Sequence, residues 1–267
     1  MKSLSLNFLL LLCLSLTFIS CNKDDSDDND DQTTTQQTAP NTTPDAPGDA
    51  DGVLAAVNSI QSMDISEGVQ IPGAPSTLDV EFNIAVAAFF ENKNTESYVA
   101  AGDVTVNTDN TLEIQDNNSY VTAYDATSTD GMDLGFSAGS TVEWKVSGSA
   151  DVDAFTFTTT KRMPGDVTLE GDYKEVDISA NLTVSIDKVS TNADSVLFFL
   201  AGENDKYVKF TAAGNATSHT FTSAELSVLT GTGVVQVVPF TIEPEEFGGK
   251  NFYFVNEVVV TSFTEFK

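Results

Sequence analysis

The segment Val142-Glu143-Trp144-Lys145-Val146 alternates strictly between apolar and charged residues. Because successive side chains of a β-strand point to opposite faces, this alternation predicts a strand with one buried and one solvated face. Similar runs, rich in Val, Thr and Phe, recur along most of the chain and are interrupted by Gly, Asn, Asp or Pro. Short alternating runs bounded by such residues are typical of all-β proteins, so we predict an all-β fold.

The first series of runs predicts a β-sandwich domain over residues 52–163. Its first run, Val53–Ile60, also fits a short helix because it contains alanines, but Gly52 before it and the β-branched residues within it favour a strand. The strands expected in this series lie near Val53–Met63, Leu78–Phe90, Tyr98–Asn107, Thr111–Asp116, Tyr120–Tyr124, Gly131–Phe136, Thr141–Val146 and Ala154–Thr160.

The alternation stops at Lys161-Arg162-Met163-Pro164-Gly165, a turn-rich and locally basic stretch that predicts a domain boundary. A second series then predicts strands near Val167–Leu169, Asn181–Ile186, Ser195–Ala201, Tyr207–Ala212, His219–Phe221, Val234–Ile242 and Phe252–Phe266. About seven strands in about a hundred residues is the size of an immunoglobulin-like sandwich. We therefore predict two immunoglobulin-like β-sandwich domains after an acidic tether, the second domain covering residues 164–267.

A helical spacing of apolar residues interrupts the second series between Phe221 and Leu229. Ser223 is the expected N-cap, and Glu225 to Leu229 are expected to form one or two helical turns between the sheets. The Cys–Trp–Cys pattern of antibody domains is absent from the sequence, so the expectation concerns architecture alone.

Acidic residues dominate the composition, with 40 Asp and Glu against 12 Lys and Arg and a formal net charge of −28. Binding to phosphate polyanions relies on Lys and Arg, so this charge argues against nucleic acid as a partner and against adsorption to anionic head groups. It favours solubility and interactions with cations or basic partners.

The two cysteines, Cys13 and Cys21, both lie near the N-terminus. The remainder of the chain therefore cannot form disulfides, thiolate metal sites or a Cys nucleophile. A hydrophobic core must stabilise the fold without covalent crosslinks, which a chain of this length can supply.

The N-terminal segment has the three parts of a secretory signal: a positive charge at Lys2, an apolar run from Leu4 to Ile19, and the small residue Ser20 before Cys21. The apolar run is shorter than the roughly 20 residues that a membrane-spanning helix needs. We predict a signal peptide over residues 1–20. An ordinary cleaved signal with an incidental cysteine, or a transmembrane anchor, remain the alternatives.

Two short motifs around Cys21 carry a family resemblance. Phe18-Ile19-Ser20-Cys21 resembles a bacterial lipobox, with Phe where Leu is commoner. The adjacent residues Lys23, Asp24 and Asp25 resemble the export signal that directs lipoproteins of the Bacteroidota to the outer face of the outer membrane. The resemblance implies a lipoprotein that is cleaved before Cys21 and carries diacylglycerol on its sulfur and an acyl chain, such as palmitate, on its new amine. Several acyl chains anchor a protein essentially permanently, whereas one chain binds reversibly.

The implied location is the outer membrane, with the protein lipid-anchored through Cys21 and facing the cell exterior. Residues Val53 to Lys267, with the segments GVLAAV and FYFVNEVVVTSFTEF, are also similar in apolar alternation to uncharacterised surface lipoproteins of the same bacterial group. This second resemblance implies no particular chemistry.

Residues 21–51 are mostly Asp, Asn, Thr, Gln, Pro and Ala, a composition that buries too little apolar surface to offset the entropy of ordering. We predict an acidic, disordered tether, whose ends as a flexible coil would lie about 30 Å apart. The acidic cluster from Asp24 to Asp31 could instead bind calcium, but it lacks the spaced Gly and distal Glu of an EF-hand loop.

The search for catalytic residues is negative. The single histidine, His219, has no GxSxG or HExxH motif near it, and it is expected to be a strand residue half in solvent. A zinc site needs three or four His, Cys or carboxylate ligands. Glycoside hydrolysis needs only two carboxylates, but their abundance here without a motif indicates nothing. We predict no enzyme activity, no cofactor and no catalytic metal.

Structural calcium is the one cofactor that the sequence leaves open. The oxygen-rich turns Asn107–Asn110 and Gln115–Asn118, and the spaced acids Asp125, Asp130 and Asp133, each offer hard oxygen ligands. Asn and Asp are also the residues that tolerate turn geometry, and this simpler interpretation is favoured.

Candidate ligand-binding residues are the aromatic side chains Trp144, Tyr98, Tyr120 and Tyr124, which could stack on a sugar. Where aromatic residues are adjacent, one ring points in and the next out, so Phe90, Phe199 or Tyr253 is expected on an outer face. Contact with a neighbouring domain, or covering of the sheet, is the favoured role for such a ring.

Asp194-Ser195-Val196 resembles the O-glycosylation acceptor of secreted proteins in this phylum, which makes Ser195 a candidate modification site.

These observations predict a cell-surface lipoprotein with a structural or complex-forming accessory role in the outer membrane. The alternative is a glycan-binding or adhesive module displayed on the cell surface. The expected partners are the membrane, through the lipid on Cys21, and either a glycan or an outer-membrane protein.

Overall fold

A computed structural model describes residues 48–64, 77–92, 97–108, 110–122 and 133–267 of the chain. Apart from the one-turn helix α2 (Ser223–Leu226), its regular elements are β-strands. The all-β class that the alternation predicts is therefore confirmed.

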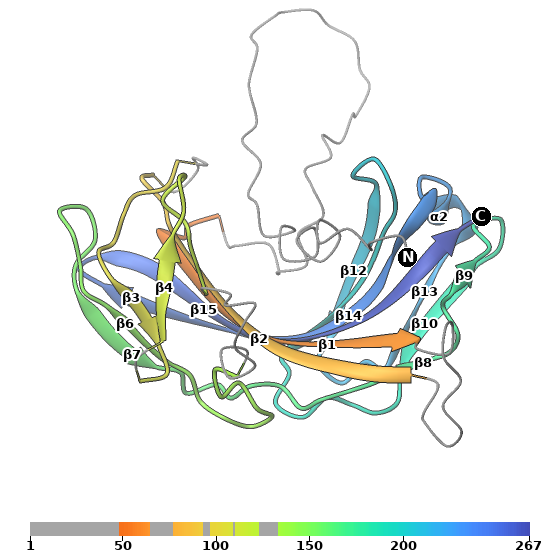
Figure 1. Ribbon diagram of the computed structural model, residues 1–267, viewed down its shortest axis with the longest axis horizontal. Coiled ribbons are helices and arrows are strands. Elements are labelled where there is room, and N and C mark those ends of the chain that lie inside the picture. The colour runs from red at the N-terminus through yellow and green to blue at the C-terminus, as the bar shows by residue number, and fades with distance from the viewer. Residues whose placement is uncertain (1–47, 65–76, 93–96, 109, 123–132) are drawn as a thin grey trace, which may run out of the picture.

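Four long strands run across the molecule and join its two ends (Figure 1). They are β1 (Gly52–Asp64), β2 (Thr77–Phe89), β14 (Gly231–Phe247) and β15 (Lys250–Phe266). β1 pairs antiparallel with β2 and parallel with β15, and β14 and β15 form an antiparallel hairpin. The first and last strands of the fold are thus direct neighbours, with Gly52 opposite Phe252 and Gln61 opposite Thr261.

Shorter strands extend this sheet on both sides. Beyond β2 it continues through β5 (Tyr120–Thr122), β4 (Asn110–Ile114), β3 (Val104–Val106), β6 (Glu143–Val146) and β7 (Phe155–Thr158). Beyond β14 it continues through β11 (Ser195–Ala201) and β12 (Tyr207–Ala213), and β9 (Glu175–Val176) pairs with the end of β15. Together these are twelve strands of one mixed sheet.

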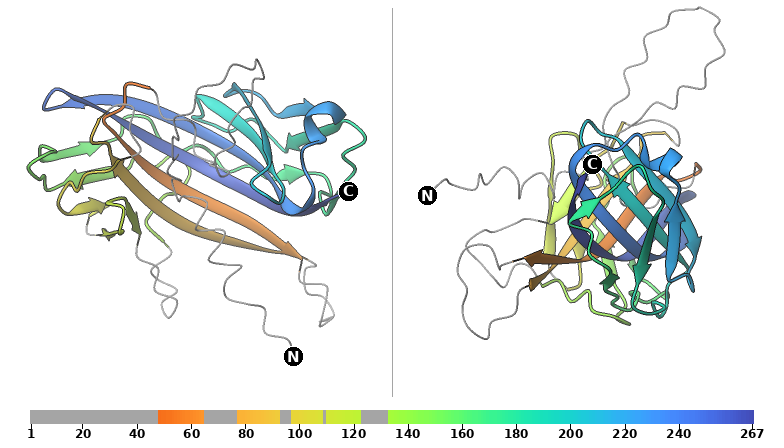
Figure 2. Two further views of the ribbon diagram at one scale, coloured as in Figure 1. Left: turned by 90° about the horizontal axis from the view of Figure 1, so that it is seen from above. Right: turned by 90° about the vertical axis from the view of Figure 1, so that its right-hand side faces the viewer.

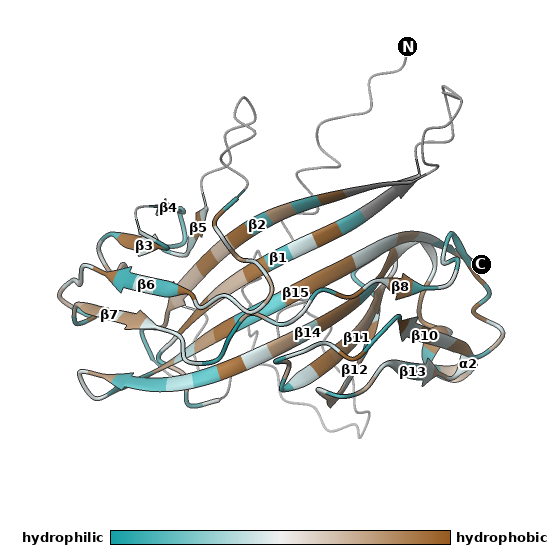
Figure 3. Ribbon diagram, turned by 90° about the horizontal axis from the view of Figure 1, so that it is seen from below, coloured by the Kyte–Doolittle hydropathy of each residue, from teal (hydrophilic) through white to brown (hydrophobic). Residues whose placement is uncertain are grey.

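A second sheet of three strands has the order β13 (Ser218–Phe221), β10 (Leu182–Ile186) and β8 (Leu169–Glu170). It lies with α2 at the end of the molecule opposite to β3, β6 and β7 (Figures 2 and 3). Val184 and Ile186 of β10 share one buried cluster with Val196 and Phe198 of β11. The second sheet therefore packs across the core from the β11 side of the large sheet.

The predicted division into domains 52–163 and 164–267, and the immunoglobulin-like assignment of the second, are not confirmed. β1 and β2 come from the first predicted domain and β14 and β15 from the second, yet the four are consecutive in one sheet. An immunoglobulin-like sandwich needs its seven strands in two sheets of its own. Alternation identifies strands but not their partners, which is why it suggested a boundary that the hydrogen bonding crosses.

Several local predictions also change. Val53–Ile60 is a strand, as favoured, but Tyr98–Asn107 contributes only Val104–Val106, and residues 133–136 of the predicted strand Gly131–Phe136 form none. The helix is capped by Thr222 and not by Ser223. Thr222 Oγ1 accepts a hydrogen bond from the Glu225 amide, and the Glu225 carboxylate accepts one from the Thr222 amide at 2.7 Å, which is a capping box.

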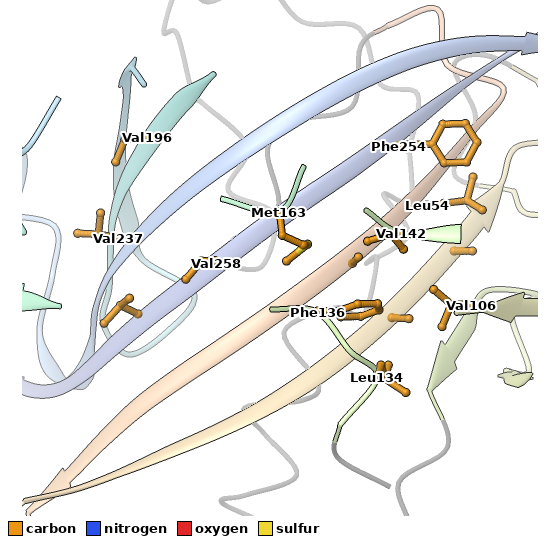
Figure 4. Packing of buried hydrophobic residues seen from close by; sticks show 14 of the residues in the cluster. Leu54, Val106, Leu134, Phe136, Val142, Met163, Val196, Val237, Phe254 and Val258 are labelled. Atoms are coloured by element: carbon orange, nitrogen blue, oxygen red, sulfur yellow. The ribbon is translucent and has the colours of Figure 1, made fainter. Parts of the chain in front are cut away.

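One face of the long strands, here called the core face, carries Leu54 and Ala56 of β1 and Phe254 and Val258 of β15, all buried. Figure 4 shows that this core runs from Phe136, Val106 and Leu134 at one end, past Met163, to Val196 and Val237 at the other. These residues belong to one continuous buried cluster. The two ends therefore share a core, which a chain of two independent sandwiches would not do.

Two polar contacts fix loops against the core face. Asn83 Oδ1 accepts hydrogen bonds from the amides of Leu134 and Phe136, at 2.9 and 3.1 Å. Its Nδ2 donates to Asn58 Oδ1 at 3.1 Å, so both functional groups of this buried side chain are used. The loop before β6 is thereby held to the middle of β2.

The second contact, here called the Glu243 latch, fixes the stretch in which the domain boundary was predicted. The buried carboxylate of Glu243 accepts hydrogen bonds from the amides of Thr160 and Lys161, at 2.8 and 3.0 Å, and from the Thr160 hydroxyl. Asn256 Nδ2 donates to the Lys161 carbonyl at 2.9 Å. The segment is thus bound to β14 and β15.

The reverse side of the long strands, here called the opposite face, carries two smaller apolar clusters. One is centred on Val57, Phe199, Val238 and Phe240, and the other on Ala55, Val86 and Val255. All members of both clusters come from strands of the large sheet itself. Central strands of this sheet are therefore apolar on both faces, as in sheets buried on both sides.

Candidate functional site

The aromatic residues predicted to bind ligand are largely buried. The exposed fractions are 0% for Trp144, 2% for Tyr120 and 8% for Tyr98. Tyr120 has a structural role, because its hydroxyl accepts a hydrogen bond from the Ala101 amide at 2.8 Å and donates one to the Gly102 carbonyl at 2.9 Å. A stacking platform needs an accessible ring face. The prediction is therefore wrong for these three residues, and Tyr124 lies outside the described residues.

The outward-pointing rings also have protein partners. Phe199 is buried in the opposite-face cluster, and half-buried Phe90 packs on Tyr98 with ring centroids 5.6 Å apart. Tyr253 donates its hydroxyl proton to Asp49 Oδ1 at 2.7 Å, and this hydrogen bond raises the pKa of Tyr253. These rings fix strands and the entering chain, in line with the favoured packing role.

Cys21, Lys23, Asp24 and Asp25 lie outside the described residues. The described chain begins at Gly48 and is attached at once to β15. The Asp51 amide donates to the Asn251 carbonyl at 2.8 Å, and an Asp51 carboxylate oxygen accepts from the Asn251 amide at the same distance. Whatever precedes residue 48 is thus joined to the fold at the start of β15.

Ser195 is half-buried at the start of β11. The neighbouring Asp194 carboxylate forms an ion pair with Lys161 Nζ at 2.5 Å, and Lys161 also donates to the Ile242 carbonyl at 2.8 Å. In the folded chain the Asp of the acceptor pattern is therefore engaged in a contact between segments. Glycosylation of Ser195 stays a prediction.

His219 lies on β13 and stacks on Phe210 of β12, with ring centroids 3.8 Å apart and planes inclined by 8°. Desolvation by burial lowers the pKa of His219, partly offset by the charge of Glu225. The neutral imidazole is favoured there, and its contact joins the three-stranded sheet to the edge of the large sheet.

The turns proposed for calcium differ in what they bring together. Asp109, Asp125 and Asp130 lie outside the described residues, and the remaining described chain contains no group of three or more His, Cys, Asp or Glu side chains suited to a metal ion. In the turn Gln115–Asn118, Asn118 has a φ of 64° and donates to the Tyr98 carbonyl at 3.1 Å. Asn118 thus has the turn geometry that the sequence favours over calcium binding.

The turn Asn107–Asn110 borders a pocket of about 560 Å³, here called the Asn107 pocket. Three segments form its walls: the β3–β4 turn, the loop at Asp133 to Gly135, and the start of β6. Its lining residues are Asn107, Thr108, Asn110, Asp133, Leu134, Gly135, Thr141 and Glu143.

Asn107 joins the three walls of this pocket. Its Oδ1 accepts a hydrogen bond from the Glu143 amide at 2.9 Å, and its Nδ2 donates to the Leu134 carbonyl at 2.8 Å. Its backbone has a φ of 41°, in the left-handed region that Asn tolerates better than most residues. The sequence indicates this turn and Asp133 separately, and the contacts of Asn107 with Leu134 and Glu143 place them around one pocket.

Neither the known family models nor the curated proteins include a match to this chain. Among the described residues, no helix has the length and apolar character needed to cross a membrane.

Proposed function

We propose that this protein is a cell-surface lipoprotein, anchored in the outer membrane through Cys21, with a structural or complex-forming accessory role. The observation that carries the proposal is the adjacency of the lipobox-like Phe18–Cys21 and the export-like Lys23, Asp24 and Asp25. Two short motifs in the order that one pathway needs are more specific than either motif alone.

The charge of the chain and the attachment of its polar N-terminal segment to the fold support an accessory role. A formal charge of −28 keeps an anchored protein soluble and away from anionic head groups. A rigid all-β body attached at Gly48 to a long polar segment is suited to holding a partner at some distance from a membrane.

Cell fractionation tests the anchoring. The wild-type protein is expected in the outer-membrane fraction, and Cys21→Ala is expected in soluble fractions, with Cys13→Ala as the matched control that leaves anchoring unchanged. Protease added to intact cells is expected to digest the wild-type protein. Retention of Cys21→Ala in the membrane would exclude the lipid anchor, and resistance to protease would exclude surface display.

The accessory role is tested by crosslinking in intact cells followed by isolation of the protein. An outer-membrane protein recovered with the wild type in constant ratio supports a complex-forming role. Its absence, together with saturable binding of a glycan by the purified chain, supports the alternative function as a glycan-binding module. The Asn107 pocket favours keeping this alternative, because its lining is rich in hydrogen-bonding groups.

A further inference from the structure

We propose that the Asn107 pocket binds a neutral saccharide through the carboxylates of Asp133 and Glu143 and the hydroxyls of Thr108 and Thr141. The proposal rests on the alternative function of glycan binding and moves its site from the buried aromatic rings to this pocket. The pocket volume of about 560 Å³ lies within the usual range of small-molecule sites.

Hydrogen bonds between described residues join the walls of the pocket. Asn107 bonds to Glu143 and Leu134 through its side chain, and its amide donates to the Glu143 carbonyl at 2.9 Å. Asn110 Nδ2 donates to the carbonyls of Val106 and Asn107, at 3.2 and 3.1 Å. The backbone of the walls is thus already held, and binding would have to order mainly the side chains that meet the ligand.

The groups left for a ligand are mainly acceptors. The Glu143 carboxylate and the two threonine hydroxyls make no hydrogen bond to another described residue. Asp133 uses Oδ1 to accept from the Gly135 amide at 2.8 Å, which leaves its other oxygen for a ligand. A carboxylate accepts from two donors at once, and each hydroxyl both donates and accepts. Adjacent hydroxyls of a sugar ring match such a set.

The charge of the pocket selects among saccharides. Among the described residues that line it there are two carboxylates and no Lys or Arg, and the whole chain is strongly acidic. An acidic sugar would be repelled at close range, so a neutral sugar is the better ligand. The hydrogen bonds to carboxylates are charge-assisted, which makes them stronger than bonds between neutral groups.

The test is a titration of the purified full chain, in buffer containing EDTA, with the methyl glycosides of mannose, galactose and N-acetylglucosamine, and with glucuronic acid as the acidic comparison. Binding is followed by NMR at the amides of Asn107, Gly135 and Glu143. At least one neutral glycoside is expected to shift these resonances saturably, and glucuronic acid is not.

Variants locate the site. Glu143→Ala and Asp133→Asn are each expected to weaken binding about tenfold, the loss typical of one hydrogen bond to a charged group. Asp133→Asn retains an acceptor for the Gly135 amide, and Glu113→Gln on exposed β4 is the control expected to bind as the wild type. Both site residues are exposed, so the fold is expected to persist in these variants.

The outcomes separate the site from the function. Binding that all variants retain would overturn the site while leaving glycan binding in place. No binding of any glycoside by the wild type would overturn this proposal, and negative results on a broad glycan array as well would overturn the alternative function. In the same buffer without EDTA, shifts of these resonances by calcium chloride alone, with no response to sugars, would identify a cation site instead.

Discussion

The two ends of the molecule use the same long strands in different ways. At one end the large sheet continues by hydrogen bonding through β5, β4, β3, β6 and β7. At the other end a separate sheet, β13-β10-β8, packs across the core from β11. The long strands β1, β2, β14 and β15 are part of both ends, so neither end is complete without them. A repeated strand pattern can therefore come from strands of one continuous sheet.

The largest expected effect comes from separating the ends. The fragment Val167–Lys267 is expected to be unfolded, because β15 loses its partner β1 and Phe254 loses Phe157, whose ring centroid lies 4.4 Å away. Circular dichroism and urea titration of the fragment, beside the chain 48–267, measure this. A cooperative unfolding transition of the fragment would restore the two-domain interpretation.

The next effect concerns the end formed by β3 to β7. Trp144→Ala is expected to lower the free energy of unfolding by about 3–5 kcal/mol, because it empties a fully buried site. Trp144→Phe is the matched control and is expected to cost less, since Nε1 of Trp144 is buried without a hydrogen-bond partner among the described residues. Calorimetry should show one transition that moves as a whole. Two transitions, of which Trp144→Ala shifts only one, would show that the two ends unfold independently.

The Glu243 latch tests how the ends are joined. Glu243→Ala removes the acceptor for two backbone amides and a hydroxyl, and is expected to cost about 2–3 kcal/mol of unfolding free energy. Glu245→Ala, at an exposed position of the same strand, should change it by less than about 0.5 kcal/mol. Equal effects of the two substitutions in urea titrations would show that the latch does not stabilise the joint.

A smaller effect is expected at the β13 end. Thr222→Ala removes the N-cap of α2 and should cost about 1 kcal/mol, while Thr222→Ser, which keeps the hydroxyl, should cost little. Thermal unfolding of the two variants measures the difference. A loss as large with Ser as with Ala would assign the effect to the methyl group and not to the cap.

The smallest effect is a dependence on pH through His219. Its pKa is lowered in the folded state, so the folded protein binds a proton less readily than the unfolded chain. This contribution to stability is complete above the unfolded pKa of about 6.5 and is lost as the pH falls through that value toward the lower folded pKa. His219→Phe should make the melting temperature less dependent on pH between about pH 7.5 and 5.5. If the melting temperature of the variant depended on pH as strongly as that of the wild type, groups other than His219 would cause the dependence.

The sequence by itself determined the fold class and the position of most strands. Alternation at Val142–Val146 and along Val53–Ile60 depends only on which face of each strand is apolar, and this is a local property. The lipobox-like segment Phe18–Cys21 and the acidic stretch after it predicted Cys21 as the lipid attachment site. These residues lie outside the described ones, and fractionation can test the prediction.

Only the tertiary structure decided which strands pair and which side chains remain exposed. The parallel pairing of Gly52 with Phe252 joins residues far apart in the sequence, and no local pattern encodes it. Trp144 was a candidate binding residue by its type, but it is fully buried in the core at the end formed by β3 to β7. The Asn107 pocket arises where three separate segments meet. Contacts of this kind depend on how sheets curl and cover one another, and the sequence carries that information only through the whole chain.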